Sequence, residues 1–272
     1  MLTTDFVPGT PNWIDLGVPD TEAAVAFYSA VFGWTFRSAG PQAGGYGFFQ
    51  LDGRTVAAVG PLTEAGASPA WTAYFMVADA DGTLTAVERA GGTVRVPPGD
   101  VFTAGRMAAF TDPTGADFAV WQPRDIGGLE RVMEPGTLCW TELYTTDAAA
   151  AKDFYRSVFQ WRYEEMGGTG DAGAADEVSY SVVSSPGGGR GGDAGQGGIM
   201  QLHEDNLAAG STSEWHPYFG VTDCDTAFAL ATRHGATVMI PPMDVPGVGR
   251  LAMVMDPAGA QFALLTGDPG TT

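Results

Sequence analysis

The strongest constraint on the fold of this chain is an internal repeat. Segment 8–16 (PGTPNWIDL) is matched 127 residues later by segment 135–143 (PGTLCWTEL), with the tryptophan and the leucine in register. Segment 71–75 (WTAYF) is matched 144 residues later by segment 215–219 (WHPYF). A chain that repeats itself over so long a period folds as copies of one structural unit. The sequence therefore predicts two similar domains in tandem.

The change in offset, 144 − 127 = 17, locates a 17-residue insertion in the second copy. It falls in the Gly-rich stretch 167–198, whose composition is typical of a flexible loop. Such a loop is either a lid over a binding site or an insertion tolerated at the surface. The repeat itself predicts domains at 1–124 and 135–268, joined by a linker at 125–134.

Each copy carries the same local pattern. In the first copy, alternating apolar residues predict a strand at 12–18, and apolar residues spaced by three and four predict a helix ending near Phe32. Asp20 or Thr21 caps the start of this helix and Gly33 stops it. Further strands are expected at 35–38, 46–51, 55–59, 72–77, 93–96, 105–111 and 117–122, with a second helix at 81–90. The order β-α-β-β-β thus occurs twice in each copy, which predicts an α+β fold of four modules.

The charge balance excludes some partners. The chain has 13 basic and 32 acidic residues, a net charge of −19. Such a protein repels a phosphate backbone and an anionic membrane surface, so no nucleic acid partner is expected.

The sequence shows no sign of export or of a thiolate site. No apolar run approaches the roughly 20 residues that cross a bilayer, and the first residues have neither the basic start nor the apolar core of a signal peptide. We therefore expect a cytoplasmic protein with no membrane partner. Cys139 and Cys224 form no C-x-x-C pair, which argues against a thiolate metal cluster and a disulfide framework.

Two motifs carry a resemblance to a known family. Segment 27–34 (FYSAVFGW) is echoed by segment 154–161 (FYRSVFQW), and each copy ends with an Asp-Pro-x-Gly turn, at Asp112 and at Asp256. The chain resembles the vicinal oxygen chelate superfamily, which includes glyoxalase I, ring-cleaving (extradiol) dioxygenases and bleomycin- and fosfomycin-resistance proteins. More narrowly, it is similar to tandem glyoxalase-like proteins of actinobacteria.

The resemblance implies an architecture. In this superfamily two β-α-β-β-β modules curl a mostly antiparallel sheet into a cup that holds the ligand, with the helices outside. Members often pair two short chains to complete their cups, whereas here the duplication supplies the second half within one chain. We therefore expect a monomer, with a weak homodimer as the alternative.

The resemblance also locates the positions at which family members bind a divalent metal through His, Gln and Glu side chains. In this chain the six positions hold Trp13, Thr72 and Ala119 in the first copy and Trp140, His216 and Ala263 in the second. Only His216 is a usual metal ligand. We therefore expect no metal and no other cofactor. The alternative is a divalent metal in the C-terminal cup, where Glu142, His216 and Gln261 could converge.

Strand alternation indicates which side chains face into each cup. The first cup is predicted to show Trp13, Asp15, Tyr74, Met76, Asp117 and Trp121, and the second Trp140, Glu142, Tyr144, His216, Tyr218, Gln261 and Leu265. Aromatic walls with a few polar groups are typical of small-molecule pockets, and flat rings suit a planar ligand. The alternative is that these aromatic residues fill the cups as core.

Three classes of function are compatible with these features. The first is metal-free binding or sequestration of an aromatic or polyketide-like metabolite or antibiotic. The second is an enzyme, a lyase, isomerase, cyclase or oxygenase, acting in the C-terminal cup with His216 as general acid or base and Glu142 orienting it. The third is an interaction module that uses the fold only as a scaffold.

Overall fold

The structure, a computed structural model, describes residues 1–64, 66–166, 179–187 and 194–268. The first copy of the repeat contains, in chain order, β1 (Pro11–Val18), α1 (Thr21–Phe32), β2 (Thr35–Ser38), the short 3₁₀ helix η1 (Pro41–Ala43), β3 (Gly47–Leu51), β4 (Arg54–Pro61), β5 (Ala70–Met76), α2 (Ala80–Arg89), β6 (Thr93–Val101), β7 (Gly105–Thr111) and β8 (Asp117–Pro123). The second copy contains β9 (Leu138–Thr145), α3 (Ala148–Phe159), β10 (Arg162–Met166), β11 (Tyr180–Ser184), β12 (Gly197–Gln201), α4 (Glu204–Ala208), β13 (Glu214–Gly220), α5 (Cys224–Arg233), β14 (Thr237–Val245), β15 (Gly249–Met255) and β16 (Gln261–Gly267).

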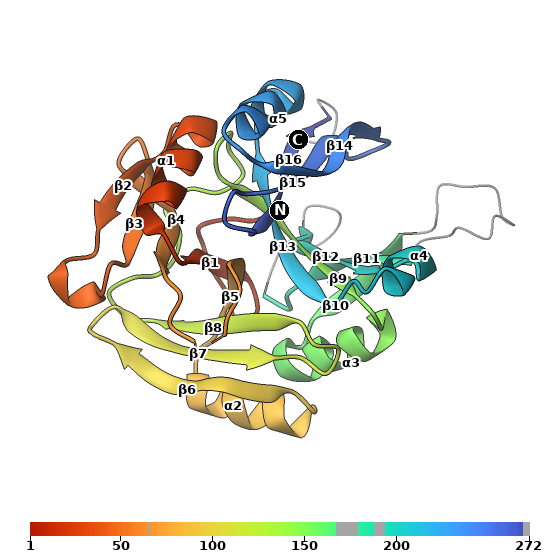
Figure 1. The fold of residues 1–272 in the computed structure, drawn as a ribbon. Coiled ribbons are helices and arrows are strands. Elements are labelled where there is room, and N and C mark those ends of the chain that lie inside the picture. Colours follow the sequence, from red (N-terminus) through yellow and green to blue (C-terminus); the bar gives the residue numbers. More distant parts are fainter. Residues whose placement is uncertain (65, 167–178, 188–193, 269–272) are drawn as a thin grey trace, which may run out of the picture. The chain divides into compact units, whose positions relative to one another are not determined.

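Each copy forms one eight-stranded mixed sheet, and the two sheets follow the same plan (Figure 1). The strand order is β2-β3-β4-β1-β5-β8-β7-β6 in the first and β10-β11-β12-β9-β13-β16-β15-β14 in the second. In the first sheet β1 pairs with β4 and β5 with β8 in parallel, whereas the hairpins on either side are antiparallel. The predicted α+β fold with two tandem repeats is confirmed.

The predicted first helix of each copy is confirmed, together with its capping. The Asp20 side chain accepts a hydrogen bond of 3.0 Å from the backbone N–H of Ala23, and Asp147 does the same for α3. α1 ends at Gly33 in the left-handed conformation, with φ = 72°. α3 ends at Gln160 with φ = 60°, a conformation that costs a residue with a Cβ more than it costs glycine.

The structure corrects two local expectations. β6 continues through Pro97 and Pro98 to Val101 because it is an edge strand with register shifts, where a missing N–H is tolerated. The Gly-rich stretch 167–198 is not loop throughout, since β11 lies within it and β12 begins there. The predicted lid or surface loop falls on 167–178 and 188–193, which lie outside the described residues. The short helices η1 and α4 had no clear signal in the sequence.

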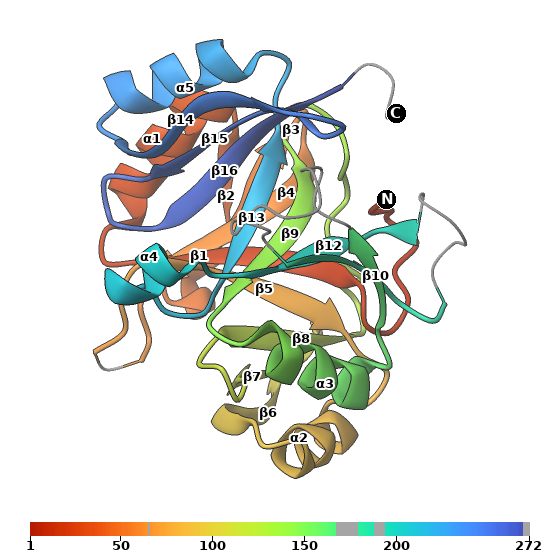
Figure 2. The same ribbon diagram turned by 90° about the vertical axis from the view of Figure 1, so that its right-hand side faces the viewer.

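The chain divides into two compact units, and each combines one module from each copy. Unit 1 comprises Met1–Trp13, Ala73–Gly128 and Trp140–Trp215, and unit 2 comprises Ile14–Thr72, Leu129–Cys139 and His216–Thr272. Within unit 1 the helices α2 and α3 pack against each other (Figure 2), and within unit 2 the helices α1 and α5 do the same.

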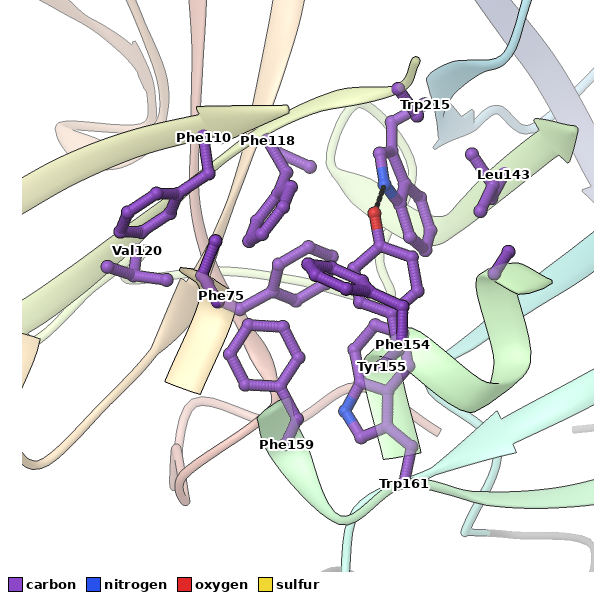
Figure 3. Close-up of a cluster of buried hydrophobic side chains, with 14 of the residues drawn as sticks. Phe75, Phe110, Phe118, Val120, Leu143, Phe154, Tyr155, Phe159, Trp161 and Trp215 are labelled. Atoms are coloured by element: carbon purple, nitrogen blue, oxygen red, sulfur yellow. Dashed lines mark hydrogen bonds between the residues drawn. The ribbon is translucent and has the colours of Figure 1, made fainter. Parts of the chain in front are cut away.

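The core of unit 1 joins the two copies through aromatic rings. Phe75 of β5 and Phe118 of β8, from the first copy, lie against Tyr155 and Phe159 of α3, from the second (Figure 3). The Phe118 and Tyr155 ring centres are 5.5 Å apart, and those of Phe75 and Phe159 are 5.4 Å apart. The core of unit 2 is built in the same way, with Tyr28 of α1 placed 5.5 Å from Phe262 of β16.

The two family motifs meet within these cores. In unit 2 the Tyr28 hydroxyl donates a 2.9 Å hydrogen bond to Asp256 Oδ2, and Trp71 Nε1 donates to Tyr28 at 3.0 Å. The other oxygen, Asp256 Oδ1, accepts the backbone N–H groups of its own Asp-Pro-x-Gly turn. Burial, and then the charge of Asp256, raise the pKa of Tyr28 well above its usual value. This aspartate therefore fixes a turn of one copy and a helix of the other.

No helix in the described part of the chain is both long and apolar enough to cross a bilayer.

Candidate functional site

The strand registers support the predicted alternation on β5 and β8. Phe75 and Val120 are paired in register and belong to the core packed against the helices. Their neighbours Tyr74 and Trp121 therefore lie on the opposite face of the sheet, the cup face. Met76 pairs with Trp121 on that face, and Tyr74 pairs with Ala119.

The cup-face residues of the first copy differ in accessibility. Trp13, Tyr74 and Trp121 are buried, whereas Met76 is half-buried. Trp121 is also held in place, because its Nε1 donates a 2.8 Å hydrogen bond to the carbonyl of Ile126. Its ring covers Gly105, where a Cβ would overlap the indole. For these three rings the burial favours a role as core.

Asp117 is engaged at the surface. It is half exposed, forms a 2.7 Å ion pair with Arg95, and accepts a 2.6 Å hydrogen bond from Thr111 Oγ1. Both oxygens of the Asp117 carboxylate therefore have partners within the protein.

The second copy presents a polar and aromatic cluster within unit 1. Trp140, Glu142 and Tyr144 alternate along β9, so all three side chains lie on one face. Tyr180 donates a 2.9 Å hydrogen bond to Glu142 Oε2, and Trp140 Nε1 lies 3.2 Å from both Glu142 Oε2 and the Tyr180 hydroxyl. Glu142 is 7% exposed, whereas Trp140 and Tyr144 are half-buried. The cluster thus places a buried carboxylate between two partly accessible rings.

Glycines make this cluster possible. A Cβ at Gly198, which pairs with Glu142 across β12 and β9, would collide with the Tyr180 hydroxyl. A Cβ at Gly195 would lie 3.2 Å from the Trp140 ring. Burial, and then the charge of Glu142, raise the pKa of Tyr180, so its hydroxyl stays protonated and donates.

The first copy has a counterpart in unit 2. The Tyr46 hydroxyl donates a 3.0 Å hydrogen bond to Asp15 Oδ2, and a Cβ at Gly60 would overlap the Tyr46 ring. Asp15 is half-buried and corresponds to Glu142 in the repeat. The sequence analysis found both carboxylates but missed both tyrosines. The available signal was a tyrosine at the start of the third strand of each copy, Tyr46 just before β3 and Tyr180 as the first residue of β11, which the insertion takes out of register.

The remaining predicted residues of the second cup lie in unit 2. His216 and Tyr218 are buried, at 3% and 5% exposure, and Gln261 and Leu265 are half-buried. Burial lowers the pKa of His216 to about 3, from about 6.5 for an ordinary histidine. Its imidazole is therefore neutral near pH 7. Glu142 belongs to unit 1, so the convergence of Glu142, His216 and Gln261 stays a prediction.

Four of the six residues at the positions where the family resemblance places metal ligands offer no atom that suits a divalent ion. Ala119 and Ala263 are fully buried and have no donor atom, and Trp13 and Trp140 offer none that binds a metal. Among the described residues, no group of three His, Cys, Asp or Glu side chains is placed to hold a metal ion.

The cysteines are not activated nucleophiles. Burial raises the pKa of Cys139 to about 12 and that of Cys224 to about 11, which keeps both as thiols near neutral pH.

Two depressions of unit 1 lie elsewhere. One of about 290 Å³ is lined by residues that include Asp79, Gly82 and Phe159, and one of about 140 Å³ by residues that include Leu2 and Gln196. Neither includes a predicted cup-face residue.

Comparisons with known proteins agree with this architecture. The family model described as Glyoxalase/Bleomycin resistance protein/Dioxygenase superfamily matches residues 10–120 and 137–264. "Putative glyoxylase CFP32" of Mycobacterium tuberculosis is 37% identical over 272 residues, covering 98% of each chain. "Anthracycline biosynthesis protein DnrV" of Streptomyces peucetius is 38% identical over 277 residues, covering 96% of this chain and 94% of its own.

Solved structures show the same fold at low identity. The 2,3-dioxygenase LapB from Pseudomonas sp. KL28 superposes with a TM-score of 0.64 at 16% identity, over 96% of this chain and 93% of its own. An Mn(II)-bound glyoxalase from Novosphingobium aromaticivorans gives 0.60 at 16% identity, over 95% and 83%. With the two matched segments and relatives aligned along nearly their whole length, the chain belongs to the Glyoxalase/Bleomycin resistance protein/Dioxygenase superfamily.

Proposed function

We propose that this protein binds a planar aromatic or polyketide-like small molecule on the cup face of its second domain. The observation that carries the proposal is the cluster on β9. There, Trp140 and Tyr144 are partly accessible on either side of the buried Glu142 carboxylate. Flat rings supply stacking surface for a planar ligand, and one polar group sets its orientation.

Two further observations support the proposal. A relative at 38% identity is named for anthracycline biosynthesis, and anthracyclines are planar aromatic polyketides. Of the three positions at which the family resemblance places metal ligands in this domain, two hold Trp140 and Ala263, which offer no metal-binding atom, and the third holds His216. Binding through aromatic surface suits these residues better than binding through a chelated ion.

The proposal is tested by calorimetric titration with 1,8-dihydroxyanthraquinone. Calorimetry is preferred to intrinsic fluorescence because the chain has seven tryptophans, and Trp34, Trp71, Trp161 and Trp215 lie in the cores. We expect Trp140→Leu to weaken binding about tenfold, which corresponds to about 1.4 kcal/mol, within the range of one aromatic contact plus its buried area.

The repeat offers a matched control. Trp13 occupies the same position in the first copy but is buried, so Trp13→Leu is expected to leave the affinity unchanged in protein that keeps its circular dichroism spectrum. A wild-type protein that binds no member of a panel of hydroxylated anthraquinones and anthracyclines contradicts the proposed function.

A second candidate function is catalysis in the same domain. The observation that favours it is the buried Glu142 carboxylate, with a tyrosine hydroxyl 2.9 Å away, in a chain 37% identical to a relative named as a glyoxylase. Turnover of the hemithioacetal of methylglyoxal, lost in Glu142→Gln and in His216→Gln, would identify an enzyme. Metal analysis of protein purified without chelators would complete that test.

A further inference from the structure

We propose that the first domain carries a separate binding surface for an aromatic carboxylate, with the guanidinium group of Arg37 pairing with the carboxylate of the ligand. The surface consists of Arg37, Phe48 and Tyr46, on and beside β2 and β3. It lies in the other copy from the cluster on β9, so the inference does not depend on the proposed function.

The position of Arg37 follows from strand pairing in the first sheet. Cross-strand pairs join four residues of β2, β3, β4 and β1 into one row, which consists of Arg37, Phe48, Ala58 and Asp15. The next residue along β3, Phe49, has its ring centre 5.7 Å from that of Tyr28 in α1, so Phe49 faces the helix. Side chains alternate along a strand, and Phe48 with its whole row therefore lies on the opposite face, the cup face.

Arg37 is held on this face by an aromatic ring. Its guanidinium carbon lies over the Phe48 ring, 4.6 Å from the ring centre, which is the distance of a cation–π contact. Phe48 is only 9% exposed, whereas Arg37 is exposed. The buried ring thus supports a guanidinium group that solvent and ligands can reach.

The charge of Arg37 has no counterpart within the described part of the protein, where no hydrogen bond or ion pair engages its guanidinium group. Other arginines of the chain are saturated with carboxylates: Arg106 pairs with two aspartates, and so does Arg250. With 32 acidic residues for 13 basic ones, partners for an arginine are plentiful. An accessible arginine that keeps its donors free on the cup face is therefore suited to an anionic ligand.

Tyr46 supplies ring surface beside this cation. Its ring centre lies 6.1 Å from that of Phe48, and the side chain is half-buried. The hydrogen bond of 3.0 Å from its hydroxyl to Asp15 Oδ2 fixes the ring, and Gly60 leaves room for it. A guanidinium group and a partly accessible ring on two sides of one phenylalanine fit a ligand that combines a ring with an anion.

The surrounding charges are compatible with a singly charged anion at Arg37. Asp15 ends the row three strands away from Arg37, a separation of about 14 Å at the usual strand spacing. Physiological salt screens charges over about 8 Å, so Arg37 outweighs Asp15 at its own position. A carboxylate also matches two N–H groups of a guanidinium at once, which makes it a better partner than a spherical anion.

The second copy lacks this cation. Its matching row across β10, β11, β12 and β9 consists of Glu164, Val182, Gly198 and Glu142. Glu164 stands where the first copy has Arg37, so this row carries a carboxylate at each end and repels an anion. The inference therefore concerns the first domain alone.

Equilibrium dialysis with 2-naphthoate and with its neutral analogue 2-naphthamide tests the inference. We expect the wild type to prefer 2-naphthoate about fivefold at low salt, as one charge-assisted contact at an accessible site allows, and less in concentrated salt. Arg37→Gln is expected to lose this preference while keeping its affinity for 2-naphthamide. Arg54→Gln is the matched control and is expected to keep the preference, because Arg54 is exposed on the same sheet but pairs with Glu130.

A further variant separates the two domains. Trp140→Leu removes ring surface from the second domain and is expected to keep the preference for 2-naphthoate. A preference that survives in Arg37→Gln, or one that disappears in Trp140→Leu, overturns the inference. A wild type that binds the two probes equally, or binds neither, overturns it as well, whereas the proposed function is decided separately by the titrations with hydroxylated anthraquinones and anthracyclines. Circular dichroism of each variant checks that the fold is intact.

Discussion

At the scale of single residues, burial decides what His216 can do. The family resemblance places His216 at one of six metal-binding positions, where it is the one usual metal ligand, and an ordinary histidine titrates near pH 6.5. At 3% exposure its pKa falls to about 3, because the charged imidazolium loses its hydration. Near neutral pH the side chain is therefore a neutral imidazole and a weak base.

This lowered pKa predicts a pH-dependent stability. Below about pH 6.5 the unfolded chain takes up a proton on His216, whereas the folded chain does so only near pH 3. The unfolded state binds more protons in this window, so the contribution of His216 is fully present above pH 6.5 and is lost as the pH falls. Between pH 7 and pH 5 the wild type is expected to lose about 2 kcal/mol more unfolding free energy than His216→Gln does.

Urea unfolding at the two pH values measures this difference. His234→Gln is the matched control for replacing a histidine, because His234 is exposed at the end of α5. Equal slopes for the wild type and His216→Gln contradict the prediction.

At the scale of elements, the repeat provides two versions of one helix. α1 and α3 begin with the same aspartate cap, but α1 ends at a left-handed glycine and α3 at the left-handed Gln160. A Cβ at Gly33 has no atom within 4 Å, so the difference between the two ends is conformational rather than steric.

Exchanging these residues is expected to have opposite effects. Gln160→Gly relieves the left-handed strain and is expected to raise the unfolding free energy by about 0.5 kcal/mol, since part of the gain is offset by the greater freedom of glycine in the unfolded chain. Gly33→Ala is expected to lower the unfolding free energy by about 1 kcal/mol. Thermal unfolding of both variants measures the two shifts, and shifts of the same sign would contradict this account.

At the scale of the whole molecule, the sequence copies and the compact units do not coincide. Each sheet belongs to one copy, but each core joins a module of the first copy to a module of the second. In unit 1, Phe75 and Phe118 are covered by Tyr155 and Phe159, and Trp215 donates a 2.9 Å hydrogen bond to the Tyr155 hydroxyl (Figure 3). A single copy would leave these apolar faces in water.

Separated domains are therefore expected not to fold alone. Fragments 1–124 and 135–268 are expected to lack a cooperative thermal transition individually and to regain one when mixed, because only the mixture completes both cores. Circular dichroism during heating measures the transition. The full-length chain cut by a protease at a site engineered into 125–134 serves as the control and is expected to stay assembled. A cooperative transition in either fragment alone would show that one sheet is sufficient.

The sequence by itself determined what depends on local period and local chemistry. Alternation and helical spacing predicted the main helices and most strands of the four modules, Asp20 and Gly33 marked the limits of α1, and the repeat predicted two matching sheets. The alternation on β9 placed Trp140, Glu142 and Tyr144 on one face, since side-chain direction in a strand follows from position alone.

The tertiary structure alone decided what depends on contacts between distant segments. Core contacts such as that between Phe118 and Tyr155 determine which modules pack against each other. The periodicity of a strand or helix shows which of its faces is buried but not which element covers that face. Tyr180 meets Glu142 across 38 residues of chain, over a glycine whose importance appears only when three strands lie side by side. The lowered pKa of His216 has the same origin, because burial is a property of the packed chain and not of the residue.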